Sequence, residues 1–138
     1  MAKENETVYG FAVELAGDFD AVRAAVVEAL KGEGFGVLTE IDVSATMKAK
    51  LGQDMPRYNI LGACNPTLAH KAISAEPDIG LLLPCNVVVS EVSAGTIKVS
   101  FMDPVAVLAL VNNSQVTELG WQVRGKLEAV RDSLKPKN

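Results

Sequence analysis

The most apolar run of the chain is Gly80-Leu81-Leu82-Leu83-Pro84-Cys85-Asn86-Val87-Val88-Val89. Its valine-rich second half is typical of a buried β-strand. Pro84 interrupts the run in the middle, although proline is disfavoured in a central strand because it has no N–H to donate to a neighbouring strand. Conflicts of this kind between a local rule and its surroundings concentrate at functional sites. We therefore expect the rest of the chain to be organised around this stretch.

A similar patch occurs earlier, in Leu61-Gly62-Ala63-Cys64-Asn65-Pro66. Both patches place a Cys-Asn pair beside a proline, and they contain the only two cysteines of the chain. If the strands that carry the patches pair, the two thiols come close together. A pair of thiols can bind a soft metal, form a reversible disulfide or carry sulfur. The alternative is that both cysteines are small buried apolar residues, which is the commonest role of free cysteine and agrees with the lack of a CxxC motif.

The composition indicates one globular domain that spans residues 1–138. Hydrophobic residues make up 49% of the 138 residues and charged residues 22%, which argues against a disordered chain. We expect residues 1–6 to be disordered and residues 136–138 to form a tail. The net charge of -4 and the lack of a concentrated basic patch argue against binding to nucleic acid.

Two further features predict a cytoplasmic protein without a membrane partner. No apolar run approaches the roughly 18 residues that a membrane span needs. The polar residues 1–6 contain no apolar segment of the kind that a signal peptide has. In the cytoplasm the two cysteines are expected to be reduced thiols.

Apolar periodicity and turn residues predict an alternation of strands and helices. Strands are expected over residues 7–15, 37–43, 57–63, 79–92 and 96–102. Helices are expected over residues 19–31, up to 51, 66–75, 104–110 and 115–134, with Asp18, Asp42 or Ser44, Asn65, Asp103 and Ser114 as their N-caps. The order β-α-β-α-β-α-β-β-α-α, with a terminal β-hairpin followed by two helices, predicts an α+β fold in which helices pack against a mixed β-sheet.

The last helix has the clearest pattern of burial. Its apolar residues recur every three or four positions and therefore share one face: Val116, Leu119, Val123, Leu127, Val130 and Leu134. Trp121 lies off this stripe, and we interpret it either as a half-buried residue at the rim or as an oligomer contact.

The surroundings of Cys64 favour it as the more reactive thiol. Cys64 precedes Asn65, the expected N-cap of a helix, where the positive end of the helix dipole favours a thiolate. His70 is the only histidine and lies two positions from both Leu68 and Ala72. If those two residues face the core, His70 faces solvent, which argues against a zinc site that includes it.

The two patches also carry a family resemblance. Together with Asp103-Pro104, they closely resemble the uncharacterised prokaryotic family known as domain of unknown function 302, over roughly residues 19–134. The resemblance implies a small α+β domain, a homodimer and no established activity. The residues that match the family pattern position for position, and so point to a shared two-cysteine site, are Cys64, Asn65, Pro84, Cys85 and Asn86.

The sequence favours a homodimeric cytoplasmic binding module with a two-cysteine pocket for a small ligand, a soft metal or sulfur. The same five residues are the candidate ligand-binding residues, and Cys64 and Cys85 are the candidate metal ligands. Two alternatives stay open. One is a thiol-dependent enzyme of sulfur or redox chemistry with Cys64 as nucleophile, and the other is a structural or assembly protein with both cysteines in its core. The sequence identifies neither a catalytic residue nor a cofactor.

Overall fold

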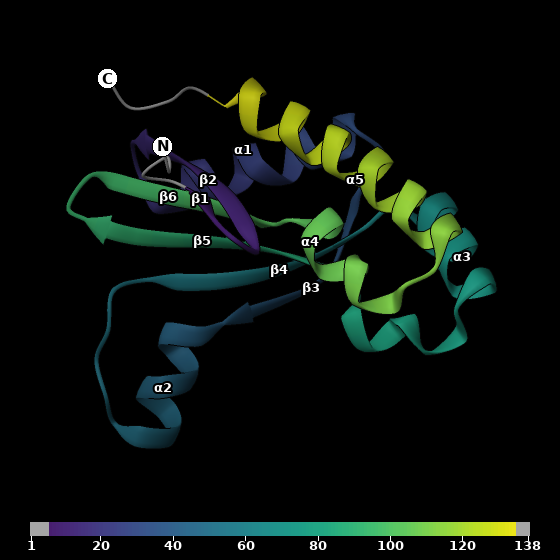
Figure 1. Ribbon diagram of the computed structural model, residues 1–138. Helices are drawn as coiled ribbons and strands as arrows, with labels where there is room; N and C mark the ends of the chain where they lie inside the picture. The colour runs from purple at the N-terminus through teal and green to yellow at the C-terminus, as the bar shows by residue number, and fades with distance from the viewer. Residues whose placement is uncertain (1–5, 135–138) are drawn as a thin grey trace.

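A six-stranded antiparallel β-sheet organises the computed structural model of the chain, which describes residues 6–134 (Figure 1). Its strands are β1 (Glu6–Thr7), β2 (Gly10–Ala16), β3 (Gly36–Asp42), β4 (Tyr58–Cys64), β5 (Cys85–Ser93) and β6 (Thr96–Met102). Their order in the sheet is β1-β2-β6-β5-β4-β3. Residues 1–5 and 136–138, for which disorder and a tail were predicted, lie outside the described residues. Glu6, also predicted to be disordered, pairs with Phe11.

The α+β class and the predicted order of elements are confirmed. The sheet is not mixed, because each pairing among the described strands is antiparallel. Strands β2 and β3 do run in the same direction, and a helix connects them. Three other strands separate them in the sheet, so the β-α-β pattern arises without a parallel pairing.

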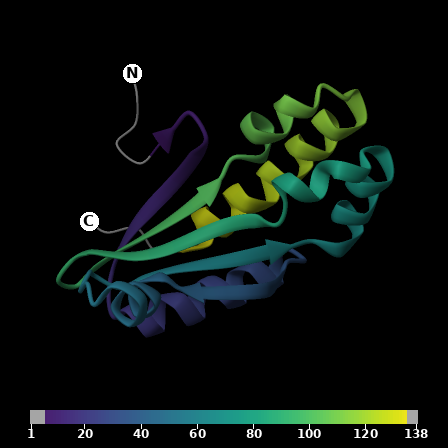
Figure 2. The ribbon, with the colours of Figure 1, turned by 90° about the horizontal axis from the view of Figure 1, so that it is seen from below.

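The helices fall into two groups. Helix α1 (Phe19–Gly32) and helix α5 (Ser114–Ser133) lie across one face of the sheet, and α3 (Pro66–Ala75) and α4 (Pro104–Leu108) pack against α5 at one end (Figure 1). Two 3-10 helices, η1 (Pro77–Leu82) and η2 (Ala109–Val111), follow α3 and α4. Helix α2 (Val43–Leu51) projects from the opposite face (Figure 2). Within residues 6–134, no helix combines the length and apolarity that crossing a membrane requires.

The core lies between the sheet and helices α1 and α5. Along β6, Ile97, Val99 and Phe101 alternate with Lys98 and Ser100, and the first three are at most 1% exposed. This alternation puts one face of the sheet in the core. The predicted stripe of the last helix is also confirmed, because all of its members are buried: Val116, Leu119, Val123, Leu127, Val130 and Leu134.

Two predicted strands differ from the observed ones. The strand expected over residues 79–92 begins only at Cys85, because Pro77–Leu82 forms the 3-10 helix η1. Pro84 therefore precedes the strand and does not interrupt it, and the Leu83–Pro84 peptide bond is cis. The strand expected over residues 7–15 is divided into β1 and β2 by a tight turn.

The N-caps of four helices are confirmed, and the fifth moves by one residue. Asp18, Asp42, Asn65 and Asp103 each accept a backbone N–H of the following helix. Helix α5, however, is capped by Asn113 and not by Ser114. The Oδ1 of Asn113 accepts from the N–H of Gln115 at 2.9 Å and of Val116 at 3.4 Å.

Replacing Asn113 with alanine is expected to lower the free energy of unfolding by about 1 kcal/mol, because two N–H groups of α5 lose their acceptor. Ser114→Ala is the matched control, and it should change stability by less than about 0.5 kcal/mol because it removes no cap. Urea denaturation of both variants measures the difference. A larger loss for Ser114→Ala would show that Ser114 is the cap.

Candidate functional site

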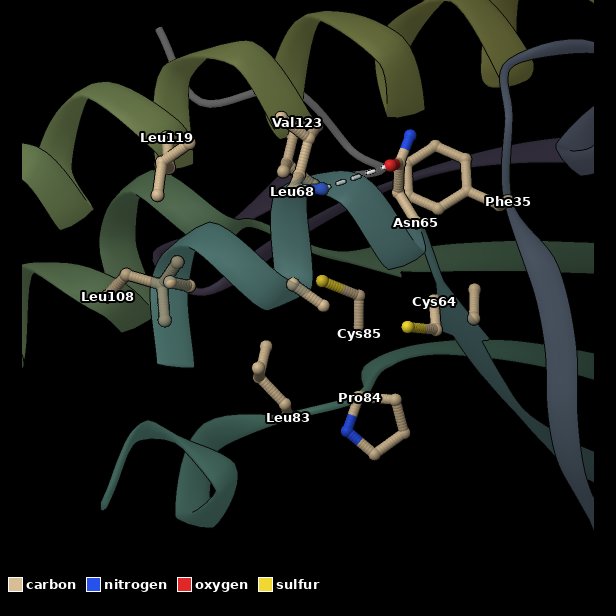
Figure 3. Close-up of a pocket in the computed structure, with 13 residues that line it drawn as sticks. Phe35, Cys64, Asn65, Leu68, Leu83, Pro84, Cys85, Leu108, Leu119 and Val123 are labelled. Atoms are coloured by element: carbon tan, nitrogen blue, oxygen red, sulfur yellow. Dashed lines mark hydrogen bonds between the residues drawn. The ribbon is translucent and has the colours of Figure 1, made fainter. Parts of the chain in front are cut away.

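Strands β4 and β5 bring the two cysteines to the same end of the sheet. The strands are antiparallel neighbours, and Ala63 is the pairing partner of Cys85. Cys64 is the last residue of β4 and Cys85 is the first residue of β5. The pairing of these strands, on which the predicted approach of the thiols depends, is therefore observed. Figure 3 shows the two side chains next to one another, with both sulfur atoms pointing to the same side.

A cavity of about 40 Å³ lies beside the two thiols. Cys64, Asn65, Pro84 and Cys85 form part of its walls. Apolar side chains from segments far apart in the sequence form most of the rest (Figure 3): Phe35, Leu68, Leu83, Leu108, Leu119 and Val123. Among the described residues 6–134, no charged side chain lines it. A single water needs about 10–15 Å³ by this kind of measure, so the cavity has room for about three atoms of that size.

The two thiols differ in their environments. Cys85 is only 6% exposed, whereas Cys64 is half-buried. Burial raises the pKa of the Cys85 thiol to about 11, and the neighbouring Cys64 contributes to the rise. Cys85 is therefore uncharged at neutral pH, and Cys64 is the more exposed of the two cysteines.

Asn65 positions the helix that covers the cavity. Its Oδ1 accepts from the N–H of Leu68 at 3.2 Å, and Pro66 occupies the first helical position. The cap places Leu68 of α3 over the thiols, because the first turn of the helix begins directly at the end of β4. The part that Asn65 plays is thus to orient the α3 backbone.

Asn86 is the one candidate residue that does not line the cavity. It follows Cys85 in β5, and successive side chains of a strand point to opposite faces. Asn86 is consequently exposed on the face of the sheet that carries α2, where it lines a different groove. The structure therefore brings together four of the five candidate residues.

Pro84 is held at the cavity by its contact with Gly62 of β4. A Cβ atom added to Gly62 would lie 2.9 Å from Cγ of Pro84, which is closer than real Cβ contacts allow, and it would also overlap the side chain of Thr39. Glycine is therefore required here so that Pro84 and Thr39 can pack over the strand.

Replacing Gly62 with alanine is expected to lower the free energy of unfolding by about 1–2 kcal/mol, because Pro84 or the strand must shift. Gly36→Ala in the neighbouring strand is the control, since a Cβ atom there meets nothing within 4 Å. Chemical denaturation of the two variants tests the contact. Equal stability of both variants would contradict the role of Gly62.

The site offers two sulfur ligands and no more. Within residues 6–134, no group of three or more His, Cys, Asp or Glu side chains is placed to hold a metal ion. His70 is exposed, as the sequence predicted, and lines a polar groove between α3 and α5. Metal binding by Cys64 and Cys85 stays a prediction.

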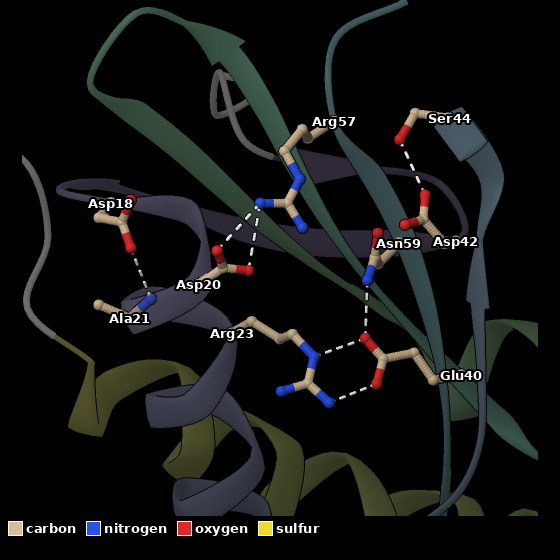
Figure 4. Close-up of polar contacts among 9 residues, drawn as sticks. All are labelled: Asp18, Asp20, Ala21, Arg23, Glu40, Asp42, Ser44, Arg57 and Asn59. Carbon is tan, nitrogen blue, oxygen red and sulfur yellow. Dashed lines mark hydrogen bonds and ion pairs between the residues drawn. The ribbon is translucent and has the colours of Figure 1, made fainter. Parts of the chain in front are cut away.

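A polar cluster at the β3 edge has a structural explanation. Arg23 of α1 forms a bidentate ion pair with Glu40 of β3, and Asn59 donates to the same carboxylate at 2.7 Å (Figure 4). The hydrogen bond from Arg23 holds the pKa of Glu40 below its usual value. Arg57 pairs with Asp20 at 3.1 Å. Each charge faces an opposite charge, so the cluster fastens α1 to the edge strand.

The sequence did not identify the apolar walls of the cavity. Leu119 and Val123 were recognised only as members of the buried stripe of the last helix, and Leu83 only as part of the apolar run 80–89. The six apolar wall residues come from five separate segments, and only the tertiary packing of α3, α4 and α5 at the ends of β4 and β5 brings them to one place.

Comparisons with known proteins agree with the predicted family. The family model described as "Domain of unknown function DUF302" matches residues 11–134. An uncharacterized conserved DUF302 protein from Bacillus stearothermophilus, known from a crystal structure, is similar with a TM-score of 0.85 and 27% sequence identity, over 94% of this chain and 100% of that one. No curated protein matches the sequence. The chain belongs to the DUF302 family.

Proposed function

We propose that this protein is a binding module whose cavity at Cys64 and Cys85 takes a small group, and that the occupant is a sulfur atom carried on Cys64. One observation carries the proposal: two thiols line one cavity with apolar walls, and the residue that bears one of them, Cys64, is only half-buried. Four of the five residues predicted from the sequence line that cavity.

Charge favours sulfur over a metal as the occupant. A soft metal would require both thiols to lose their protons, and the raised pKa of Cys85 opposes that loss among apolar walls. A sulfur atom carried on Cys64 leaves Cys85 protonated. Zinc would need two more ligands for its usual tetrahedral site, and the described residues provide no such group.

Size favours the same assignment. About 40 Å³ accommodates an added sulfur atom and little more. A drug-sized ligand or a nucleotide needs a pocket of about 300 Å³ or more. The occupant therefore has a few atoms at most, unless the helices move.

The chemistry of loading is a sulfur exchange between thiolates. The Cys64 thiolate attacks the terminal sulfur of an inorganic polysulfide or a low-molecular-weight persulfide. The sulfur–sulfur bond of the donor breaks, its electron pair leaves with the shortened polysulfide or thiolate, and a Cys64 persulfide forms. No external oxidant is required. Cys85 stays protonated beside it and keeps the cavity free of a second charge.

Anaerobic purification followed by intact mass spectrometry and elemental analysis tests the proposal. The expected result is a fraction of the protein that carries one added sulfur, lost after treatment with a thiol reductant. A stoichiometric metal that disappears when either cysteine is replaced would favour the metal alternative. An unmodified mass with no metal, and two thiols that react only after unfolding, would overturn the site and favour cysteines that serve only in packing.

We also propose that the protein is a homodimer and works in the cytoplasm. Free thiols persist in a reducing compartment, and a persulfide survives there only while it is sheltered. Two observations support the dimer: the family resemblance and the open face of the sheet. Multi-angle light scattering during size-exclusion chromatography measures the mass in solution, and a monomer at every concentration would contradict the dimer.

A further inference from the structure

The rest of the chain buries little of the surface of helix α2. It is nine residues long and none of its residues is buried. Its apolar stripe consists of Val43 and Met47, both half-buried, and Leu51, which is 65% exposed. In Figure 1 α2 hangs from the sheet on the side away from α1 and α5. Isolated helices of this length are marginal in water, so a further surface is needed to stabilise it.

The face of the sheet beside α2 is also open. We call it the outer face. The strand register aligns one row of its residues from β3 to β2: Ile41, Ile60, Val88, Ser100 and Ala12. None of them is buried and none is charged. An open groove of about 560 Å³ runs over this face, with Tyr58, Val88 and Val92 in its lining. An antiparallel sheet with a solvated face is normally polar on that face.

We propose that the outer face and α2 form the interface between two copies of this chain. The inference rests on the proposed homodimer and assigns its contact surface. In a two-fold dimer each copy presents the same patch, so one copy contributes both surfaces that need cover. Because α2 stands at one border of the outer face, the stripe of each α2 can pack beside the sheet of the other copy.

The size of the patch fits this partner. Four of the five strands have seven residues and β5 has nine, so together they cover at least about 19 Å by 23 Å. Helix α2 adds a strip about 13 Å long and 10 Å wide. The planar footprint is thus about 550 Å², and the accessible area of a corrugated face is larger. A stable interface takes about 800 Å² from each partner. The outer face and α2 together therefore approach the area that a dimer requires.

The charges on the outer face also permit self-association. Glu14 and Lys98 are cross-strand partners at its far side, so they offset one another. Two copies can meet there without repulsion between like charges, since each copy presents both signs. A nucleic acid would instead require an excess of basic residues.

Light scattering of the wild-type protein and three variants tests the interface. Val88→Asp puts a charge at the centre of the outer face, and Leu51→Lys puts one on the exposed stripe of α2. Both are expected to raise the dimer dissociation constant at least about 100-fold. Trp121→Asp is the matched control, since Trp121 is a 58% exposed aromatic residue of α5 on the opposite side. It should leave the dimer intact. Far-UV circular dichroism verifies that each variant is folded.

The outcomes separate the interface from the dimer itself. A wild-type monomer would overturn the homodimer and, with it, this assignment. A wild-type dimer that persists in the Val88 and Leu51 variants but dissociates in Trp121→Asp would overturn the assignment alone and place the contact on α5. Because Leu51 is exposed, its variant cannot act through the core, so a monomer in that variant supports the proposal.

Discussion

Cys64 is expected to react with iodoacetamide at neutral pH at least about 100-fold faster than Cys85 in the folded protein. Two causes act in the same direction. Cys85 is only 6% exposed, so the reagent reaches it only when the structure opens. A pKa of about 11 in place of 9.0 also leaves about 100-fold less thiolate, which is the reactive form. Timed quenching and peptide mass spectrometry give both rates from one sample.

The unfolded protein provides the control for this comparison. In concentrated urea both thiols lose their environments, and the two rates should converge to within a few-fold. If Cys85 reacted as fast as Cys64 in the folded protein, the part of the cavity next to Cys85 would be open to solvent. If neither thiol reacted before unfolding, Cys64 would be inaccessible and loading from a dissolved sulfur donor would not occur.

The free energy of unfolding of the wild-type protein is expected to fall by about 2 kcal/mol more than that of Cys85→Ala between pH 9 and pH 11. The folded state raises the pKa of Cys85 from 9.0 to about 11. Below pH 9 the thiol is protonated in both the folded and the unfolded state, and the full stabilisation is present. Above pH 9 the unfolded chain loses the proton first, so the stabilisation declines as the pH approaches 11.

Urea denaturation at several pH values between 8 and 11 measures this dependence. Cys85→Ala has a lower stability at every pH because it loses a buried sulfur, but the comparison concerns only the slope against pH. Other groups that titrate in this range, lysines and tyrosines, are common to both proteins and cancel. Parallel slopes would show that Cys85 is not desolvated in the folded state.

Local patterns predicted the elements whose signals are complete within a few residues. Asn65-Pro66 and Asp103-Pro104 marked two helix starts for two reasons. The cap side chain accepts an unpaired N–H of the first turn, and the proline at the first helical position has no N–H that needs an acceptor. The stripe of α5 was recognisable because its spacing of three and four residues extends over about five turns. The cap at Asn113 was missed because Ser114 is an equally good capping residue at the next position.

Features that depend on distant segments could not be predicted in the same way. Leu81 and Leu82 were predicted to lie in a strand because an uninterrupted apolar run shows neither helical nor strand periodicity. In the structure they belong to the 3-10 helix η1, which packs at the end of the sheet. Strand order was left open, and the adjacency of β4 and β5 is what brings the cysteines together. Cys64 and Cys85 could be named from the sequence, whereas the cavity between them depends on α3, α4 and α5.

The most direct test of the sulfur-binding proposal is the reaction of the reduced protein with inorganic polysulfide without oxygen, followed by intact mass spectrometry. We predict that the wild type gains one sulfur, that a thiol reductant removes it, and that peptide mapping locates it on Cys64. Cys85→Ser should still accept the sulfur, whereas Cys64→Ser should accept none. A wild type that gains no sulfur, or a Cys64→Ser variant that gains as much as the wild type, would contradict the proposal.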